Sequence, residues 1–134
     1  MHLTVKISPG ELLDKLTILE IKAARIEDPA KRENVRRELD SLRSDWAAAP
    51  PPSPEVRELV AELRTINAAL WEIEDRIRLK ESRQEFDDEF IRLARSVYGT
   101  NDRRTAVKRA LNLALDSDLI EEKSYTTHGE HGGS

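Results

Sequence analysis

The sequence predicts an all-α fold, an antiparallel bundle of about five helices, three long and two short, with a short N-terminal strand. Three observations support this. Hydrophobic residues make up 38% of the 134-residue chain and are mostly aliphatic, whereas 36% of residues are charged and only 4% aromatic. Apolar residues recur at spacings of three and four, the period of one helix face. Ser-Pro and Asp-Pro pairs, which mark helix starts, occur before several of these stretches. We therefore expect long amphipathic helices in one domain.

The N-terminal segment changes from a strand pattern to a helix pattern at Ser8. Apolar and polar side chains alternate in residues 3–7, which predicts a short strand. The Ser8 hydroxyl can then accept a hydrogen bond from the backbone of Glu11, and Pro9 suits the first helical position. Helical spacing continues to Asp28, which precedes a proline and so ends the first helix.

A proline-rich connector separates the second and third helices. Asp28 caps the second helix, and residues 49–54 form a stiff link after it. Ser53 caps the third helix, which is expected to run to about Arg83, roughly 45 Å at 1.5 Å per residue. Its apolar residues form a coiled-coil-like heptad seam: Val56, Leu59, Leu63, Ile66, Leu70, Ile73 and Ile77.

Two shorter helices are expected after the long one. The fourth begins near Phe86 and ends at Gly99, the usual residue for a left-handed C-terminal cap. Residues 100–102 can cap a fifth helix, which ends at Ser117. We expect these two helices to close an antiparallel arrangement of the first three.

The predicted domain covers residues 1–125, and the polar, glycine-containing tail over residues 126–134 is expected to be disordered. Residues 124–127 have modest strand propensity and could pair with residues 3–7.

Composition excludes several classes of function. With no cysteine, the chain has neither a disulfide scaffold nor a cysteine-based zinc site, and two of its three histidines lie in the tail. We expect no metal, no cofactor and no catalytic residue. The net charge of −4 argues against a nucleic-acid partner. The absence of a long apolar stretch and of a secretory signal indicates a cytoplasmic protein without a membrane span.

One face of the third helix combines an aromatic, an amide and charged groups. Asn67, Trp71, Glu74 and Arg78 recur at spacings of four and three, and Asp75 lies beside them. These side chains could line a pocket for a small polar ligand. Alternatively, they are helix-stabilising pairs beside a half-buried tryptophan.

Two charged clusters lie further along the chain. The basic one contains Arg103, Arg104, Lys108 and Arg109, and it could hold an anion or be a solvated helix face. The acidic one, residues 87–89, complements a helix dipole or could contribute to a carboxylate site for magnesium. The candidate ligand-binding residues are Asn67, Trp71, Glu74, Asp75, Arg78 and Arg104.

An apparent acidic motif is rejected on geometry. Glu55, Glu58, Glu72 and Asp75 have the spacing of the paired motif of the all-α nucleotide pyrophosphohydrolases, whose two halves face each other on separate helices. On one unbroken helix, Glu55 and Glu72 lie about 25 Å apart, too far to share a magnesium ion.

Four blocks of sequence indicate a family: SPGELLDKLTILEIKAARI, ALWEIEDRIRLKE, FDDEFIRLARSVYGTNDRRTAVKRALN and EEKSY. They resemble a small uncharacterised bacterial protein family over residues 7–125. The resemblance implies that the gene lies near those of surface-polysaccharide glycosyltransferases, and hence an accessory role in glycan assembly. It implies no catalytic residue.

Two hypotheses follow. The first is a non-enzymatic accessory, scaffold or ligand-binding protein, with the heptad seam allowing a homodimer and the charged faces holding an anionic small molecule or a partner protein. The alternative is a helical-bundle enzyme for a phosphate- or carboxylate-bearing metabolite, with Glu74, Asp75 and Asp87 as acids and Arg78 and Arg104 as cations. Convergence of these side chains on one cavity would distinguish a site from a scaffold surface.

Overall fold

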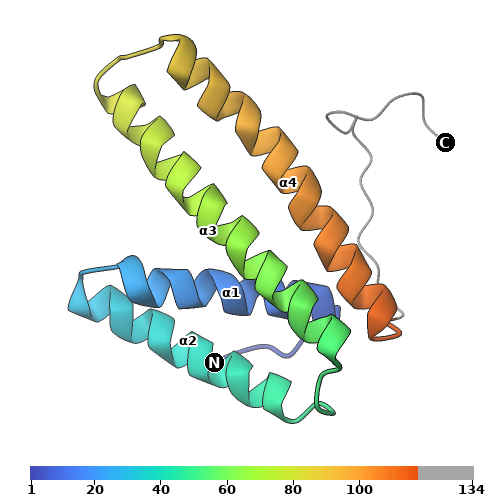
Figure 1. Cartoon of the computed structure of the whole chain (residues 1–134). Coiled ribbons are helices and arrows are strands. Elements are labelled where there is room, and N and C mark those ends of the chain that lie inside the picture. The colour runs from blue at the N-terminus through green and yellow to red at the C-terminus, as the bar shows by residue number, and fades with distance from the viewer. Residues whose placement is uncertain (118–134) are drawn as a thin grey trace, which may run out of the picture.

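A computed structural model of the chain describes residues 1–117, which form four α-helices (Figure 1). The helices are α1 (Pro9–Arg25), α2 (Pro29–Ala47), α3 (Pro54–Ser82) and α4 (Asp88–Ala114). The all-α prediction is confirmed, and α3 is unbroken over nearly the whole range expected of it. The proposed tail and the boundary at residue 125 lie outside the described residues.

The helix starts follow the predicted caps. The Ser8 hydroxyl accepts from the backbone N–H of Glu11 at 3.2 Å, and the Ser53 hydroxyl from that of Val56 at 3.2 Å. The Asp28 carboxylate accepts from the N–H of Ala30 at 2.9 Å. A proline lies at the start of each of these three helices. Each cap contributes about 0.5–2 kcal/mol, which explains why local sequence was sufficient to locate these helix starts.

The predicted N-terminal strand is wrong. Residues 1–8 have no regular secondary structure, and the side chains of Leu3 and Val5 are 78% and 71% exposed. A strand needs a neighbour to accept and donate its backbone hydrogen bonds, and no other segment within residues 1–117 is a strand. The neighbour proposed for it, residues 124–127, lies outside the described residues.

The division into a fourth and a fifth helix is also wrong. Gly99 and Thr100 lie inside α4, which begins after Asp87, whose carboxylate accepts from the N–H of Phe90 at 3.0 Å. A glycine inside a helix costs about 0.5–1 kcal/mol relative to alanine. Burial of residues on both sides of Gly99, including Leu93 and Val107, outweighs that cost.

The helices are arranged around α1. It packs against each of the other three, while α3 and α4 form an antiparallel hairpin that projects beyond the α1–α2 pair (Figure 1). This differs from the expected arrangement, in which the first three helices form the bundle and the later ones only close it. Because α4 is one long helix, it pairs with α3 and reaches α1 as well.

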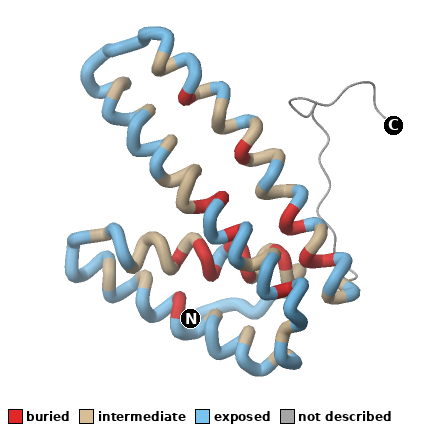
Figure 2. The backbone as a smooth tube through the Cα atoms, in the orientation of Figure 1, coloured by how far each residue is buried: buried red, intermediate tan, exposed pale blue. Residues whose placement is uncertain are grey.

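The core lies where α1 crosses the hairpin, and the buried residues gather there (Figure 2). Its buried residues come from all four helices: Leu13, Leu16, Leu19, Leu39, Val56, Leu63, Ile66, Val107 and Leu111. Along α3 the heptad seam is buried at Val56, Leu63 and Ile66 but only half-buried at Ile73 and Ile77. None of the helices in residues 1–117 has the length and hydropathy needed to cross a bilayer.

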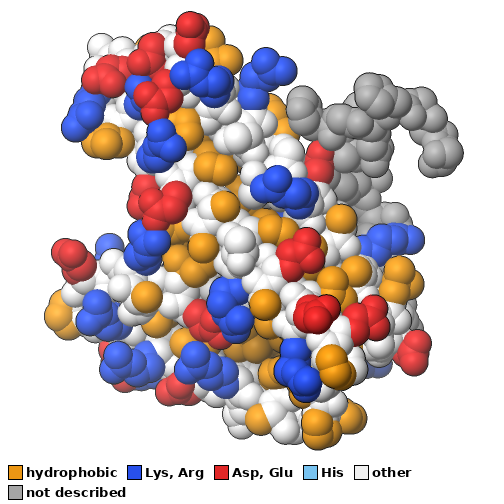
Figure 3. Space-filling model, in the orientation of Figure 1, with side chains coloured by type: hydrophobic (Ala, Val, Ile, Leu, Met, Phe, Trp, Pro, Cys, Tyr) orange, Lys and Arg blue, Asp and Glu red, His pale blue; other side chains and the backbone are white. Residues whose placement is uncertain are grey.

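The far end of the hairpin is rich in ion pairs. Lys80 Nζ lies 2.9 Å from Asp87 and 3.4 Å from Glu89, and Glu89 also binds Arg76. Figure 3 shows acidic and basic side chains gathered at this end. The hydrogen bond that Lys80 donates to Asp87 raises the pKa of Lys80 and lowers the pKa of Asp87. The acidic cluster at residues 87–89 is therefore explained by helix capping and by ion pairs.

Candidate functional site

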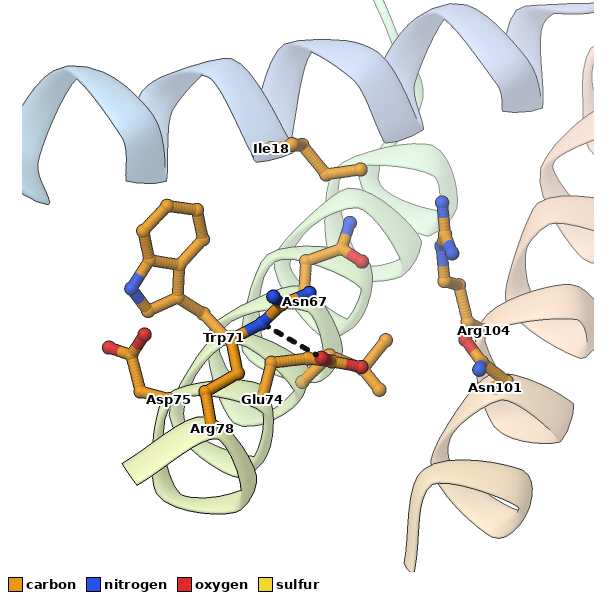
Figure 4. Close-up of a pocket in the computed structure, with 9 residues that line it drawn as sticks. Ile18, Asn67, Trp71, Glu74, Asp75, Arg78, Asn101 and Arg104 are labelled. Carbon is orange, nitrogen blue, oxygen red and sulfur yellow. Dashed lines mark ion pairs between the residues drawn. The ribbon is translucent and has the colours of Figure 1, made fainter. Parts of the chain in front are cut away.

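A cavity of about 460 Å³ lies between α1, α3 and α4, and we call it the three-helix cavity (Figure 4). It is lined by Ile18, Asn67, Leu70, Trp71, Glu74, Asp75, Arg78, Asn101 and Arg104. The structure thus brings all six candidate residues to one place, together with Asn101, Leu70 and Ile18.

Two uninterrupted helices position these side chains. On α3, Asn67, Trp71, Glu74 and Arg78 follow one another at helical spacing and so share a face. On α4, Asn101 and Arg104 are three residues apart and lie across the cavity from Trp71 (Figure 4). A helix ending at Gly99 would not fix these two residues relative to α3.

Arg104 is fixed by a buried carboxylate on α1. Its Nε donates to Asp14 Oδ1 at 2.9 Å, and its Nη2 donates to Asp14 Oδ2. Asp14 is 1% exposed, whereas the Arg104 side chain is 29% exposed and reaches the cavity. A two-pronged contact of this kind sets the plane of the guanidinium as well as its position.

Asn67 joins the same group from α3. Its Nδ2 donates to Asp14 Oδ1 at 2.9 Å and to the Thr17 hydroxyl at 2.8 Å. The Thr17 hydroxyl in turn donates to the backbone carbonyl of Asp14 at 2.9 Å. The Asp14 carboxylate is therefore the point at which α1, α3 and α4 are joined by hydrogen bonds.

The Asp14 carboxyl is held in its charged form. Burial by itself raises the pKa of this group, but the hydrogen bonds from Arg104 and Asn67 lower it. The positive charges of Arg104 and Lys108 lower it further, and the pKa of Asp14 falls below its ordinary value. Arg104, which lines the cavity, is therefore paired with a carboxylate whose charged form is favoured.

The start of α1 is docked closely on α4. The Gly10 N–H donates to Asn112 Oδ1 at 2.7 Å, and a Cβ on Gly10 would lie 2.6 Å from the Lys108 carbonyl oxygen. Glycine is required here because the two helices approach too closely for a side chain. Lys108 is buried and binds Glu11 at 2.8 Å. It therefore belongs to the α1–α4 contact and not to an exposed basic face.

The structure divides the basic cluster. Arg104 faces the three-helix cavity and Lys108 faces α1, whereas Arg103 lines a separate hollow on α4 with Arg92 and Arg95. A single anion site made of the whole cluster is not present in residues 1–117.

The mouth of the three-helix cavity contains a second, weaker ion pair. Arg78 Nε lies 3.6 Å from Glu74, with the two side chains 79% and 49% exposed (Figure 4). Trp71 is half-buried beside them. Ion pairs this exposed stabilise a helix only slightly, so these side chains can turn toward a ligand at little cost.

The other acidic candidates do not reach the cavity. Asp87 binds Lys80 at the far end of the hairpin, so the enzyme hypothesis loses one of its three acids. Glu55 and Glu72 lie on the single helix α3, which supports rejection of the pyrophosphohydrolase motif. Within residues 1–117, no three acidic or histidine side chains are grouped to hold a metal ion.

Sequence reasoning missed Asp14, although a signal for it exists. Asp14 lies inside the apolar run LLDKLTIL, one position after the buried Leu13 and three before the buried Thr17. A carboxylate in such a stripe requires a buried partner. Nothing in the local sequence identifies that partner as Arg104.

Residues 3–131 match the family of unknown function DUF6165. The chain belongs to this family. No curated protein and no solved structure matches the chain. The family match covers all four helices and every residue that lines the three-helix cavity.

Proposed function

We propose that the protein is a non-enzymatic ligand-binding protein whose three-helix cavity holds a small metabolite with a phosphate or carboxylate group. The observation that supports this most directly is the position of Arg104, which Asp14 orients at the wall of the cavity. Guanidinium groups recognise phosphate and carboxylate groups through hydrogen bonds, and Arg78 brings a second guanidinium to the same cavity.

Size and composition are consistent with a metabolite site. A volume of about 460 Å³ lies within the range of roughly 300–1,000 Å³ usual for small-molecule pockets. Apolar surface from Ile18, Leu70 and Trp71 is combined with a few convergent polar groups, which is the usual make-up of such pockets.

The solvent exposure of the side chains at the mouth of the cavity favours ligand binding over catalysis. The side chains of Glu74 and Arg78 are 49% and 79% exposed, whereas catalytic sites commonly exclude water around the reacting groups. The alternative of a helical-bundle enzyme is retained, because Glu74, Asp75 and both arginines do converge on one cavity. Turnover of a bound metabolite, followed by mass spectrometry, would support that alternative.

The biological setting is part of the proposal. We infer an accessory role in surface-polysaccharide assembly in the cytoplasm of a bacterium, on the basis of the sequence resemblance. We also propose a homodimer whose interface is formed by the α3–α4 hairpin, because the half-buried part of the α3 heptad seam is apolar. Light scattering coupled to gel filtration tests the dimer.

The ligand proposal is tested by a thermal-shift screen of the full chain. The panel contains nucleotide sugars, phosphosugars and dicarboxylates, each with and without magnesium. A ligand present at 100 times its Kd stabilises the folded state by about 2.7 kcal/mol, which gives a measurable rise in Tm. No rise in Tm with any compound of the panel would contradict the proposed function.

A further inference from the structure

We infer that the ligand of the three-helix cavity carries a positively charged ammonium group, primary or quaternary, in addition to its anionic group. This inference rests on the proposed function and narrows it to zwitterionic metabolites. It is based on the charge of the cavity wall, on the side chains around Trp71 and on the ion pairs already made within the protein.

The wall of the cavity has no net positive charge. It contains two carboxylates, Glu74 and Asp75, and two guanidinium groups, Arg78 and Arg104. The charge of Arg104 is already balanced by the buried Asp14. A ligand that is only anionic therefore gains little long-range attraction, whereas a ligand with separated charges can gain at both ends.

Arg104 lies on the opposite side of the cavity from Trp71 and Asp75, while Arg78 is paired with Glu74 on the α3 side. Arg104 and Asn101 come from α4, while Trp71 and Asp75 lie together on α3 (Figure 4). The cavity thus presents hydrogen-bond donors for an anion on one side. On the other it presents an aromatic ring beside a carboxylate, the combination that recognises ammonium groups.

Asp75 is the carboxylate available for this contact. The neighbouring charged groups are already paired with one another. Glu74 is paired with Arg78, and Glu72 on the neighbouring turn is paired with Arg25. In the described part of the chain, Asp75 makes no hydrogen bond or ion pair. A neutral polyol could also stack on Trp71, but it would leave the Asp75 charge uncompensated.

The test compares two probes that share a phosphate group. Binding of phosphocholine and of glycerol 3-phosphate to the full chain is measured by isothermal titration calorimetry. Phosphocholine has a quaternary ammonium where glycerol 3-phosphate has hydroxyl groups. We expect phosphocholine to bind about tenfold tighter or more.

Two variants locate the ammonium contact. Asp75→Asn keeps the shape of the side chain and removes its charge, so it should lower the affinity for phosphocholine to that for glycerol 3-phosphate. Asp40→Asn, at an exposed position on α2, is the matched control and should change neither affinity. Circular dichroism checks that both variants keep their helical content.

Each other outcome overturns the inference. Equal or tighter binding of glycerol 3-phosphate excludes a zwitterionic preference but leaves the proposed function intact. Unchanged phosphocholine binding by Asp75→Asn removes the assigned ammonium contact. Absence of binding by phosphocholine also overturns the inference, whereas the proposed function fails only if the thermal-shift panel is negative as well.

Discussion

Asp14 and Arg104 are ninety positions apart in the sequence, yet two hydrogen bonds join them between α1 and α4. Asn67 of α3 donates to the same carboxylate. This one buried group therefore determines how three helices meet and where the guanidinium at the cavity wall lies.

Replacement of Asp14 by asparagine should destabilise the fold strongly. Asp14→Asn leaves the Arg104 guanidinium without its counter-charge, and breaking a buried ion pair from one side costs roughly 3–5 kcal/mol. We expect about 3 kcal/mol, at the lower end, because Arg104 is 29% exposed and water solvates part of the charge. Urea denaturation followed by circular dichroism measures this change.

The exposed control Asp40→Asn should stay within about 0.5 kcal/mol of the unmodified chain. Equal stabilities of Asp14→Asn and Asp40→Asn would refute the role of Asp14.

Acid should destabilise the protein partly through the same carboxylate. The pKa of Asp14 is lowered in the folded state, so its stabilising contribution is present above the unfolded pKa of about 3.9 and is lost as pH falls through the folded pKa. Asp87 and Glu89 also have lowered pKa values and act in the same direction. The free energy of unfolding should therefore fall below about pH 4, and less steeply in Asp14→Asn. Parallel pH profiles for the two proteins would contradict this assignment.

Two glycine-to-alanine substitutions should have opposite effects. Gly10→Ala places a Cβ 2.6 Å from a backbone oxygen of α4, so the helices must move apart, at a cost of about 1–3 kcal/mol. Gly99→Ala meets no atom within 4 Å and should stabilise α4 by about 0.5–1 kcal/mol. Thermal and urea unfolding of both variants measure the difference. A destabilised Gly99→Ala would show that the helix needs glycine there for another reason.

Loss of Arg78 should weaken ligand binding without affecting the fold. Arg78→Ala removes an exposed guanidinium from the cavity mouth, and we expect about tenfold weaker binding of any anion identified in the thermal-shift screen. The matched control is Arg37→Ala on α2, because Arg37 is similarly exposed and makes a similar ion pair with Glu33 at 3.5 Å. Equal affinities of the two variants would exclude Arg78 from the site.

Local signals predicted the parts of the fold that local physics determines. Ser8, Asp28 and Ser53 locate three helix starts because capping depends on residues within one turn. The unbroken course of α3 allowed the shared face of Asn67, Trp71 and Glu74 to be identified before their cavity was known.

Long-range contacts explain what the sequence did not predict. A glycine such as Gly99 is typical of a helix end, but burial of residues on both sides of it stabilises one continuous helix. Asp14 was overlooked because its partners on α3 and α4 are distant in the chain. The expected bundle of the first three helices was wrong because α4, as one long helix, packs against both α3 and α1.

The Asp14 junction also has a consequence for the order of events during protein synthesis. A ribosome that has released α1 to α3 has delivered Asp14 and Asn67 but not Arg104, which is the last of the three to be translated. The Asp14 carboxylate lacks its guanidinium partner until α4 emerges, so the three-helix cavity is completed only after Arg104 has left the exit tunnel.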